Sequence, residues 1–232
     1  TSVKCPTDHG EAPINSFSNA GGFANASART VVAPNTDTLY SIAHLDLGKG
    51  PMVISHPDMG KRYYSFELLD PYTNVIDIPG LREDGGEAGS YVIKWKGHSG
   101  KGAKPQGARV IKSDYRRVWV IGRTLATDAK DQRKAQKLMA GYGLTNLKGK
   151  SKKFKKGCKP GEPKTFPTPT SGPEFISALN KALADNPPPK RDESLLDQLE
   201  TVGIGPGLPG DGQGLGADAQ AALYKGISDE AA

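Results

Sequence analysis

The sequence lacks a long hydrophobic run, since no stretch approaches the roughly 20 apolar residues that a membrane-spanning helix needs. We therefore expect no membrane span. Cysteine is also scarce, and neither Cys5 nor Cys158 has a neighbouring Cys or His at the spacing of zinc ligands. The sequence predicts no metal site and no cofactor.

The two cysteines allow two interpretations, because they lie far apart in the sequence. In a secreted protein they pair and tie the N-terminus to a basic segment, whereas in the cytosol they remain unrelated thiols. Asn25 opens an Asn-Ala-Ser glycosylation sequon, and the chain begins at Thr1 rather than Met, as a processed or trimmed chain does. These features favour a secreted or extracellular glycoprotein, periplasmic if the source is bacterial.

Regular structure is interrupted often, because the 232 residues include 29 Gly and 18 Pro. Short β-branched or alternating segments follow one another from residue 29 to residue 126: RTVVAP, TLYSIAHLDL, PMVISHP, RYYSFELLD, YTNVIDIPG, GSYVIKW, ARVIKS and RRVWVIGRTLA. Connections of hairpin length, without intervening amphipathic helices, predict a mainly β fold. We expect an antiparallel, jelly-roll-like sandwich with a C-terminal helical appendage.

The periodicity changes after Thr127, where DAKDQRKAQKLMAGYG predicts one surface helix. Further helices are predicted in PEFISALNKALAD, RDESLLDQLE and ADAQAALYKGISDEAA. We therefore expect a β-domain over residues 1–147, a basic and Pro-rich linker over 148–172 and a helical connector or tail over 173–232. The apolar stripe of the tail is too small for a core of its own, which predicts that the tail docks on another surface.

The net charge of +6 is concentrated in one segment, Lys148 to Lys159, which holds seven lysines and no acid. Such a run is typical of a solvated loop, and the alternative is a site for an acidic polymer. The candidate residues for that site are Lys152, Lys153, Lys155 and Lys156.

A Gly-rich segment, GIGPGLPGDG, formally contains the GxGxxG pattern of dinucleotide-binding loops. It follows a predicted helix rather than a strand, and its prolines lack the backbone N–H groups that would hold a pyrophosphate. We interpret it as a structural loop.

Polar residues are concentrated between Asn35 and Asn74, among the predicted strands. They either cap the backbone of tight turns or line a polar cleft in which carboxylates act as general acid or base. The candidates for catalysis are Asp37, Asp70, Tyr40, Tyr63, Tyr72 and Arg123, and those for ligand binding are Asn35, Tyr64 and Asn74. Two carboxylates within about 5 to 10 Å of each other would suit glycoside hydrolysis.

The segment VVAPNTDTLYSIAHLDLGKGPMVISHPDMGKRYYSFELLDPYTNV, followed by GEAGSYVI and VWVIGRTLA, resembles the domain-of-unknown-function family 1254. The family signature reads VVxPNxDTLYSxAWLDL, followed by RYY, DxYTN, an AGxY turn and a GR pair. The resemblance extends from about Asn15 to Leu147. It implies an antiparallel, jelly-roll-like β-domain and little about activity.

The segment DNPPPKRDESLLDQLETVGIGPG further resembles the connector that precedes a domain of unknown-function family 1214. Three departures stand out: a shorter segment before Asn15, His44 in place of the signature tryptophan, and no second β-domain after Ala232. The resemblance thus implies a split, processed or shortened family member. Its partner would be a second β-domain or chain, or another copy of the chain.

Three hypotheses follow from the sequence. The first is an exported β-rich protein with a structural or binding role in an assembly, whose tail docks a partner. The second is a hydrolase that uses the Asp, Tyr and Arg candidates, and the third is acidic-polymer binding through the lysine run. The sequence leaves the ligand or substrate and the oligomeric state open.

Overall fold

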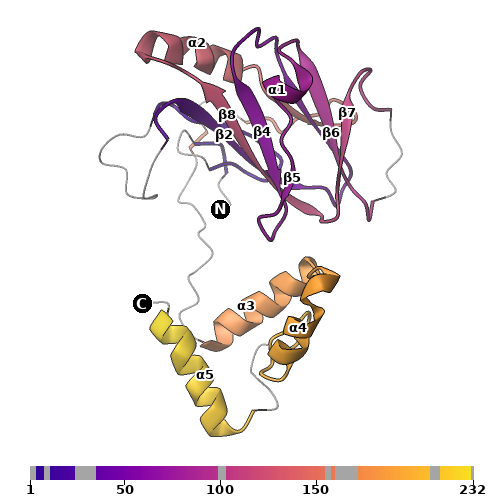
Figure 1. Ribbon diagram of the computed structural model, residues 1–232, viewed down its shortest axis with the longest axis vertical. Helices are drawn as coiled ribbons and strands as arrows, with labels where there is room; N and C mark the ends of the chain where they lie inside the picture. The colour runs from indigo at the N-terminus through magenta and orange to yellow at the C-terminus, as the bar shows by residue number, and fades with distance from the viewer. Residues whose placement is uncertain are drawn as a thin grey trace. The chain divides into compact units, whose positions relative to one another are not determined.

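Two compact units make up the chain (Figure 1). In this computed structural model the described residues are 4–7, 11–23, 35–98, 103–154, 158–159, 172–209 and 215–230. Thr1–Lys164 form the first unit, which contains the β-strands, and Thr165–Ala232 form the second, which is helical. The fold is mainly β with a few helices, as the sequence predicts.

The larger sheet of the β-rich unit has five strands, with β8 at its centre. The sheet order is β1 (Ser18–Asn19), β2 (Thr38–Asp46), β8 (Arg117–Leu125), β4 (Tyr64–Leu69) and β5 (Val75–Asp77). Neighbouring strands are antiparallel throughout. β2 and β8 pair over their full length, from Thr38 opposite Leu125 to Asp46 opposite Arg117. This ladder joins segments that are far apart in the sequence.

The smaller sheet has four strands and contains one parallel pair. Its order is β7 (Arg109–Ser113), β6 (Gly89–Trp95), β3 (Met52–His56) and β9 (Gly143–Asn146). β6 and β7 run parallel, from Tyr91 opposite Arg109 to Trp95 opposite Ser113, so the prediction of an entirely antiparallel fold is wrong here. The connection between them, residues 96–108, has about the dozen residues that a parallel crossover requires.

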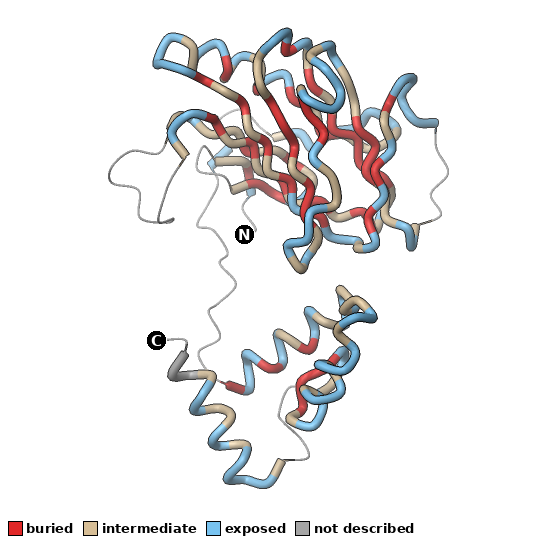
Figure 2. The backbone as a smooth tube through the Cα atoms, viewed as in Figure 1, coloured by how far each residue is buried: buried red, intermediate tan, exposed pale blue. Residues whose placement is uncertain are grey.

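The two sheets face each other across one hydrophobic core. Alternate residues of β2 (Leu39, Ser41, Ala43 and Leu45) are buried, as the period-2 pattern of that strand predicts. The same cluster contains side chains from both sheets: Leu39, Phe66 and Val120 from the larger, and Ile54, Ile93 and Leu144 from the smaller. Figure 2 shows the buried positions along the strands of both sheets.

Two helices belong to this unit, α1 (Leu81–Asp84) and α2 (Ala129–Met139). α2 lies where the sequence predicts a helix, and the side chain of Asp128 caps it by accepting from the backbone N–H groups of Lys130 and Asp131, each at 2.8 Å. Ala135 and Met139 face the core. The chain then returns as β9, a strand that the sequence analysis did not predict.

The helical unit contains α3 (Gly172–Asp185), the short 3-10 helix η1 (Lys190–Asp192), α4 (Glu193–Glu200) and α5 (Ala217–Glu230). Asn180 of α3 is 1% exposed and binds the Gly-rich segment that follows α4. Its amide nitrogen donates to the Gly203 carbonyl at 2.9 Å, and its oxygen accepts from the Gly205 N–H at 2.9 Å. The GxGxxG match is therefore a loop folded around a buried asparagine.

A disulfide joins Cys5 to Cys158, with 6.2 Å between the two Cα atoms. Of the two interpretations of the cysteines, the structure has the paired form. The bridge closes a segment of 153 residues and links the N-terminal region to the end of the lysine run.

Loss of this disulfide should destabilise the β-rich unit. The chain-entropy account assigns about 2–4 kcal/mol to a cross-link that closes a long loop, because the oxidised unfolded chain has fewer conformations. We expect reductant to lower the urea midpoint of the full chain, followed by Trp95 and Trp119 fluorescence. The double variant Cys5→Ser/Cys158→Ser should have the urea midpoint of the reduced protein, and reductant should not change that midpoint. Equal midpoints for the oxidised and reduced protein would contradict the prediction.

Candidate functional site

Asp70 caps its own turn after β4. Its Oδ1 accepts from the backbone N–H groups of Tyr72 at 2.8 Å and Asn74 at 2.9 Å, and its Oδ2 accepts from the Asn74 side-chain amide at 2.9 Å. Thr73, inside the turn, has a positive φ of 62°. Asp70 and Asn74 thus make the backbone-capping contacts that the sequence offers as one alternative for them.

Asp37 lies at the opposite end of the same sheet. The backbone N–H of Ala126, just beyond β8, donates to the Asp37 carbonyl at 3.0 Å, whereas Leu69, the neighbour of Asp70, is opposite Trp119. Seven positions along a strand correspond to about 23 Å. The structure therefore does not bring Asp37 and Asp70 into one cleft.

Asn35 organises the turn that precedes β2. Its side-chain oxygen accepts from the backbone N–H groups of Asp37 at 2.9 Å and Thr38 at 3.1 Å, and its amide nitrogen contacts the Thr38 hydroxyl. These contacts are those of an Asx turn. Asn35, a ligand-binding candidate, takes part in the local backbone structure here.

Tyr40 and Arg123 are opposite each other on β2 and β8. The Arg123 guanidinium carbon lies 5.7 Å from the centre of the Tyr40 ring, and its Nη1 donates to Glu67 Oε2 at 2.6 Å. Arg123 is thus paired with Glu67, rather than with either candidate aspartate.

Tyr63 and Tyr72 lie in two further surface contacts. The Tyr63 hydroxyl donates to the Ser65 hydroxyl at 3.3 Å, and Arg82 lies 5.9 Å from the centre of the Tyr63 ring. The Tyr72 ring packs against Tyr115 with 5.5 Å between ring centres. The structure therefore distributes the predicted catalytic residues over several parts of the β-rich unit.

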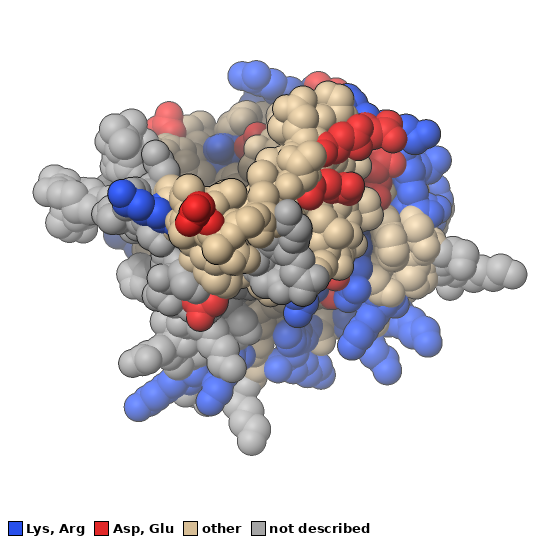
Figure 3. Space-filling model, turned by 90° about the horizontal axis from the view of Figure 1, so that it is seen from below, with Lys and Arg blue, Asp and Glu red and all other residues tan. Residues whose placement is uncertain are grey.

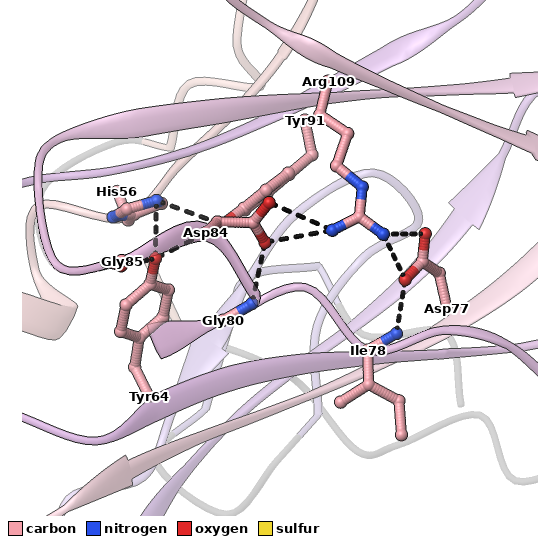
Figure 4. Close-up of polar contacts among 9 residues, drawn as sticks. All are labelled: His56, Tyr64, Asp77, Ile78, Gly80, Asp84, Gly85, Tyr91 and Arg109. Carbon is pink, nitrogen blue, oxygen red and sulfur yellow. Dashed lines mark hydrogen bonds and ion pairs between the residues drawn. The ribbon is translucent and has the colours of Figure 1, made fainter. Parts of the chain in front are cut away.

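Tyr64 belongs to a different site, a buried polar network between the two sheets (Figure 4). Its hydroxyl lies 3.1 Å from His56 Nε2, 3.3 Å from the Tyr91 hydroxyl and 3.0 Å from the Gly85 carbonyl oxygen. The Tyr91 hydroxyl lies 3.3 Å from the same His56 nitrogen. These side chains come from β4, β3 and β6, so the network joins both sheets.

The hydrogen-bonding partners constrain where the protons lie in this network. A carbonyl oxygen only accepts, so the Tyr64 hydroxyl donates to Gly85 and accepts from Tyr91 or His56. His56 Nδ1 lies 3.0 Å from the Pro57 carbonyl, which favours the tautomer with a proton on Nδ1. Nε2 of the neutral ring then only accepts, which leaves the Tyr91 hydroxyl as the donor that both Nε2 and the Tyr64 oxygen face.

Burial keeps the network uncharged. Burial lowers the pKa of His56, and the hydrogen bond to Pro57 and the charge of Asp84 oppose this shift. Burial likewise raises the pKa of Tyr64 and of Tyr91, so both phenols remain protonated near neutral pH. The imidazole and the two hydroxyls therefore form a neutral hydrogen-bonded group.

Charged residues flank the network at one end. Arg109 of β7 donates to both carboxylate oxygens of Asp84 at 3.0 and 3.1 Å, and to both of Asp77 at 2.8 and 2.7 Å. Asp84 Oδ2 also accepts from the Gly80 N–H at 3.1 Å, and Asp77 Oδ1 accepts from the Ile78 N–H at 2.8 Å. Arg109 thus connects β7 to the segment from β5 to α1.

A groove of about 470 Å³ adjoins His56. Its lining includes Val53, Ser55, Ser90, Gln106 and Thr145. β3, β6 and β9 contribute to this lining, so the groove lies over the smaller sheet. His56 lines the groove and also belongs to the buried network.

A second groove, of about 500 Å³, is lined partly by Lys49, Lys150 and Lys152. The Lys152 ammonium donates to the Ile14 carbonyl at 3.2 Å, and Lys153 is exposed. Asp46, which also lines the groove, is paired with Arg116 at 2.6 Å. Lys155, Lys156 and Asn25 lie outside the described residues.

Sequence patterns identified little of the buried network. Tyr64 is among the candidates from the sequence, whereas His56, Tyr91, Asp84, Arg109 and Asp77 are not. One signal is Gly89, opposite His56 in the sheet: a Cβ there would lie 2.8 Å from His56 Nε2. Within the described part of the chain, no cluster of three or more His, Cys, Asp or Glu residues could hold a metal ion.

Acid should weaken the fold through His56. Its pKa is lower in the folded than in the unfolded chain, so the unfolded chain binds a proton first as the pH falls through about 6.5. The free energy of unfolding should therefore decrease from pH 7.5 to about pH 5.5, above the range in which paired carboxylates titrate. Denaturant unfolding of the native chain and of His56→Gln measures this slope.

The slope should be smaller in His56→Gln, and a residual slope should remain because burial also lowers the pKa of His44. The His56 ring signal should titrate below about pH 6.5 in an NMR experiment. A midpoint above that value in the folded chain would contradict a neutral network.

Comparison with known proteins supplies the family. No curated protein matches the chain. Among solved structures it is similar to the VPA0106 protein from Vibrio parahaemolyticus, with a TM-score of 0.62 and 21% identity over 94% of this chain and 50% of that chain. The chain thus spans about half the length of that protein, and the likeness concerns the fold alone.

An uncharacterised protein from Burkholderia cenocepacia gives a TM-score of 0.37, with 9% identity over 59% of this chain and 36% of that chain. This value is too low to bear on the fold. The family described as "Protein of unknown function (DUF1254)" matches residues 14–146, which is more than half of the chain. The chain belongs to this family.

Proposed function

We propose that the chain is an exported β-rich protein with a binding or structural role, and that its helical unit docks a partner domain. The observation that carries this proposal is the surface of the helical unit. Among its described residues, Ile176 and Ile204 are the buried large apolar side chains. Phe175 of α3 is 38% exposed and Leu195 of α4 is 55% exposed.

A surface of this kind is stabilised when another body covers it. Full burial of one such side chain contributes about 1.5–3 kcal/mol of stability. The helical unit does not gain this stability from Phe175 and Leu195, because both remain exposed. The partner that we propose is a second domain. The Vibrio protein supports this choice, because the match covers only 50% of that chain. A family 1214 domain would fill this role in the arrangement that the connector resembles.

Export is supported by the disulfide between Cys5 and Cys158, because such bonds persist in oxidising compartments. No helix among the described residues has the length and apolar character that a membrane crossing needs. We propose a location outside the cytosol, a glycan at Asn25 in a source that glycosylates, and a jelly-roll-like arrangement of the two sheets.

Native mass spectrometry of the protein from its source tests the docking proposal. We expect a complex of this chain with one further domain-sized polypeptide. Phe175→Asp and Leu195→Asp should weaken the complex, because each places a charge in the apolar contact. Lys181→Asp, at an exposed position of α3, is the control and should leave the complex intact.

Two results would overturn the proposal. If the complex is equally strong in Phe175→Asp, Leu195→Asp and Lys181→Asp, the helical surface is not where the partner docks. A mass of one or two copies of this chain alone would exclude a second domain.

The second groove favours another candidate function, binding of an acidic polymer. Three lysines line it, and neighbouring Lys153 adds a further exposed cation. On the face drawn in Figure 3, Lys and Arg side chains gather in several groups, some of which lie beside Asp and Glu. This distribution suits a weak electrostatic contact that salt screens.

Heparin is a suitable probe of this second function. We expect its affinity to fall by roughly tenfold or more when the salt concentration rises fourfold, because counterions compete for the lysines. Lys150→Gln/Lys152→Gln should weaken binding and reduce the salt dependence, whereas Lys112→Gln on β7 should have little effect. Salt-independent binding, or equal loss in both variants, would contradict this role.

A further inference from the structure

We propose that the groove over the smaller sheet, lined by Ser55, Ser90, Thr145 and Gln106, binds a neutral polyhydroxylated ligand such as one or two sugar rings. Its volume of about 470 Å³ lies within the range of about 300–1,000 Å³ that is usual for small-molecule sites. This site goes beyond the role of the helical unit and does not depend on it.

Strand register places the hydroxyl groups of the groove on one face of the sheet. Ser55 of β3 is opposite Ser90 of β6, and Val53 is opposite Thr145 of β9. Residues two apart on a strand share a face, so these positions form a continuous row. The intervening residue Ile54 belongs to the core, which assigns the row to the outer face.

The polar side chains that line the groove keep their hydrogen-bonding capacity available. Among the described residues, the side chains of Ser55, Ser90, Thr145 and Gln106 make no hydrogen bond and are not buried orphans. Each hydroxyl offers one donor and two acceptor lone pairs, and the amide offers two donors and one carbonyl oxygen. Adjacent hydroxyls of a sugar ring provide the same mixture of donors and acceptors.

Charge complementarity favours a neutral ligand. The lining consists of uncharged side chains and of His56, which burial keeps neutral, so a phosphate, carboxylate or ammonium would lose hydration without gaining a counter-ion. The nearby Arg109 supplies no counter-ion to the groove, because it is paired with Asp77 and Asp84. It is also opposite Tyr91, whose ring faces the core, and therefore lies on the inner face of the sheet.

Glycines and one turn shape the ends of the groove. Gly89 leaves room for the edge of His56, as the 2.8 Å approach of a Cβ at that position shows. At the other side, the Ala108 N–H donates to the Pro105 carbonyl at 3.1 Å, which closes a turn around Gln106. Gly107 has the positive φ of 73° that the third position of a type II turn requires. Pro105, which is exposed, adds a small apolar surface suited to the C–H groups of a sugar ring.

NMR titration of the full chain tests this assignment, with maltose, cellobiose and lactose as neutral probes, and glucuronate and glucosamine as charged counterparts. Hydroxyl contacts without an aromatic platform imply a Kd of roughly 1–10 mM, so titration should extend to about 100 mM. We expect saturable shifts of the Ser55, Ser90, Gly107 and Thr145 amides with at least one neutral sugar, and weaker shifts with the charged probes.

Thr145→Val removes a hydroxyl at nearly constant volume and should weaken sugar binding by about twofold to tenfold, as should Ser90→Ala. Ser194→Ala, at an exposed position of α4, is the control and should leave the affinity unchanged. Unchanged spectra outside the groove would establish that the variants are folded.

The proposal is overturned if no neutral sugar gives saturable shifts at these amides. It is equally overturned if the charged probes bind more tightly, or if Thr145→Val and Ser90→Ala bind as tightly as Ser194→Ala. These results concern the β-rich unit, whereas the docking experiment concerns Phe175 and Leu195, so either proposal can fail without the other.

Discussion

Aromatic packing around Phe66 joins the two sheets, and the position of the buried network depends on it. The Phe66 ring lies 4.9 Å from Tyr142, 6.0 Å from Tyr64 and 6.2 Å from Tyr91, measured between ring centres. Gly122 makes room for it, because a Cβ at that position would lie 3.2 Å from a Phe66 ring carbon. Contacts of this kind position Tyr64 and Tyr91 so that both hydroxyls reach the same nitrogen of His56.

The polar groups of the β-rich unit are satisfied in two different ways, one inside the sandwich and one near the surface. Inside the sandwich, the hydroxyls and the imidazole satisfy one another without charge, which avoids the cost of burying an ion. Near the surface, carboxylates are paired with arginines or with turn backbones, as Asp84 is with Arg109 and Asp70 with its own turn. The groove over the smaller sheet differs from both, since its hydroxyls remain available to a ligand.

Local patterns predicted much of the β-rich unit. Alternation identified β2, and turn capping was one of the two roles that the sequence offered for Asp70 and Asn74, because both features depend on neighbours in the sequence. The short strands β1 and β9 were missed, since two or four residues are too few for a period to appear. The parallel pairing of β6 with β7 was also missed, because hydrophobic alternation is the same for either direction of a strand.

The candidate site was less accessible to sequence reasoning. His56, Tyr64, Asp84, Tyr91 and Arg109 come from five different elements, and no spacing rule connects them. The tyrosines that stood out in the sequence include Tyr40 and Tyr63, which make surface contacts, whereas Tyr64 alone of that set enters the network. Whether a tyrosine lies at the surface or in the network depends on strand partners that are distant in the sequence.

We propose that this member of the family is a β-rich protein tied by its Cys5–Cys158 disulfide, and that it is located outside the cytosol. Intact mass spectrometry of the protein from its native source, with thiol alkylation and without reduction, tests it most directly. The account predicts a chain that lacks the two thiol hydrogens of Cys5 and Cys158 and takes up no alkylating reagent. A chain alkylated at both cysteines would contradict it.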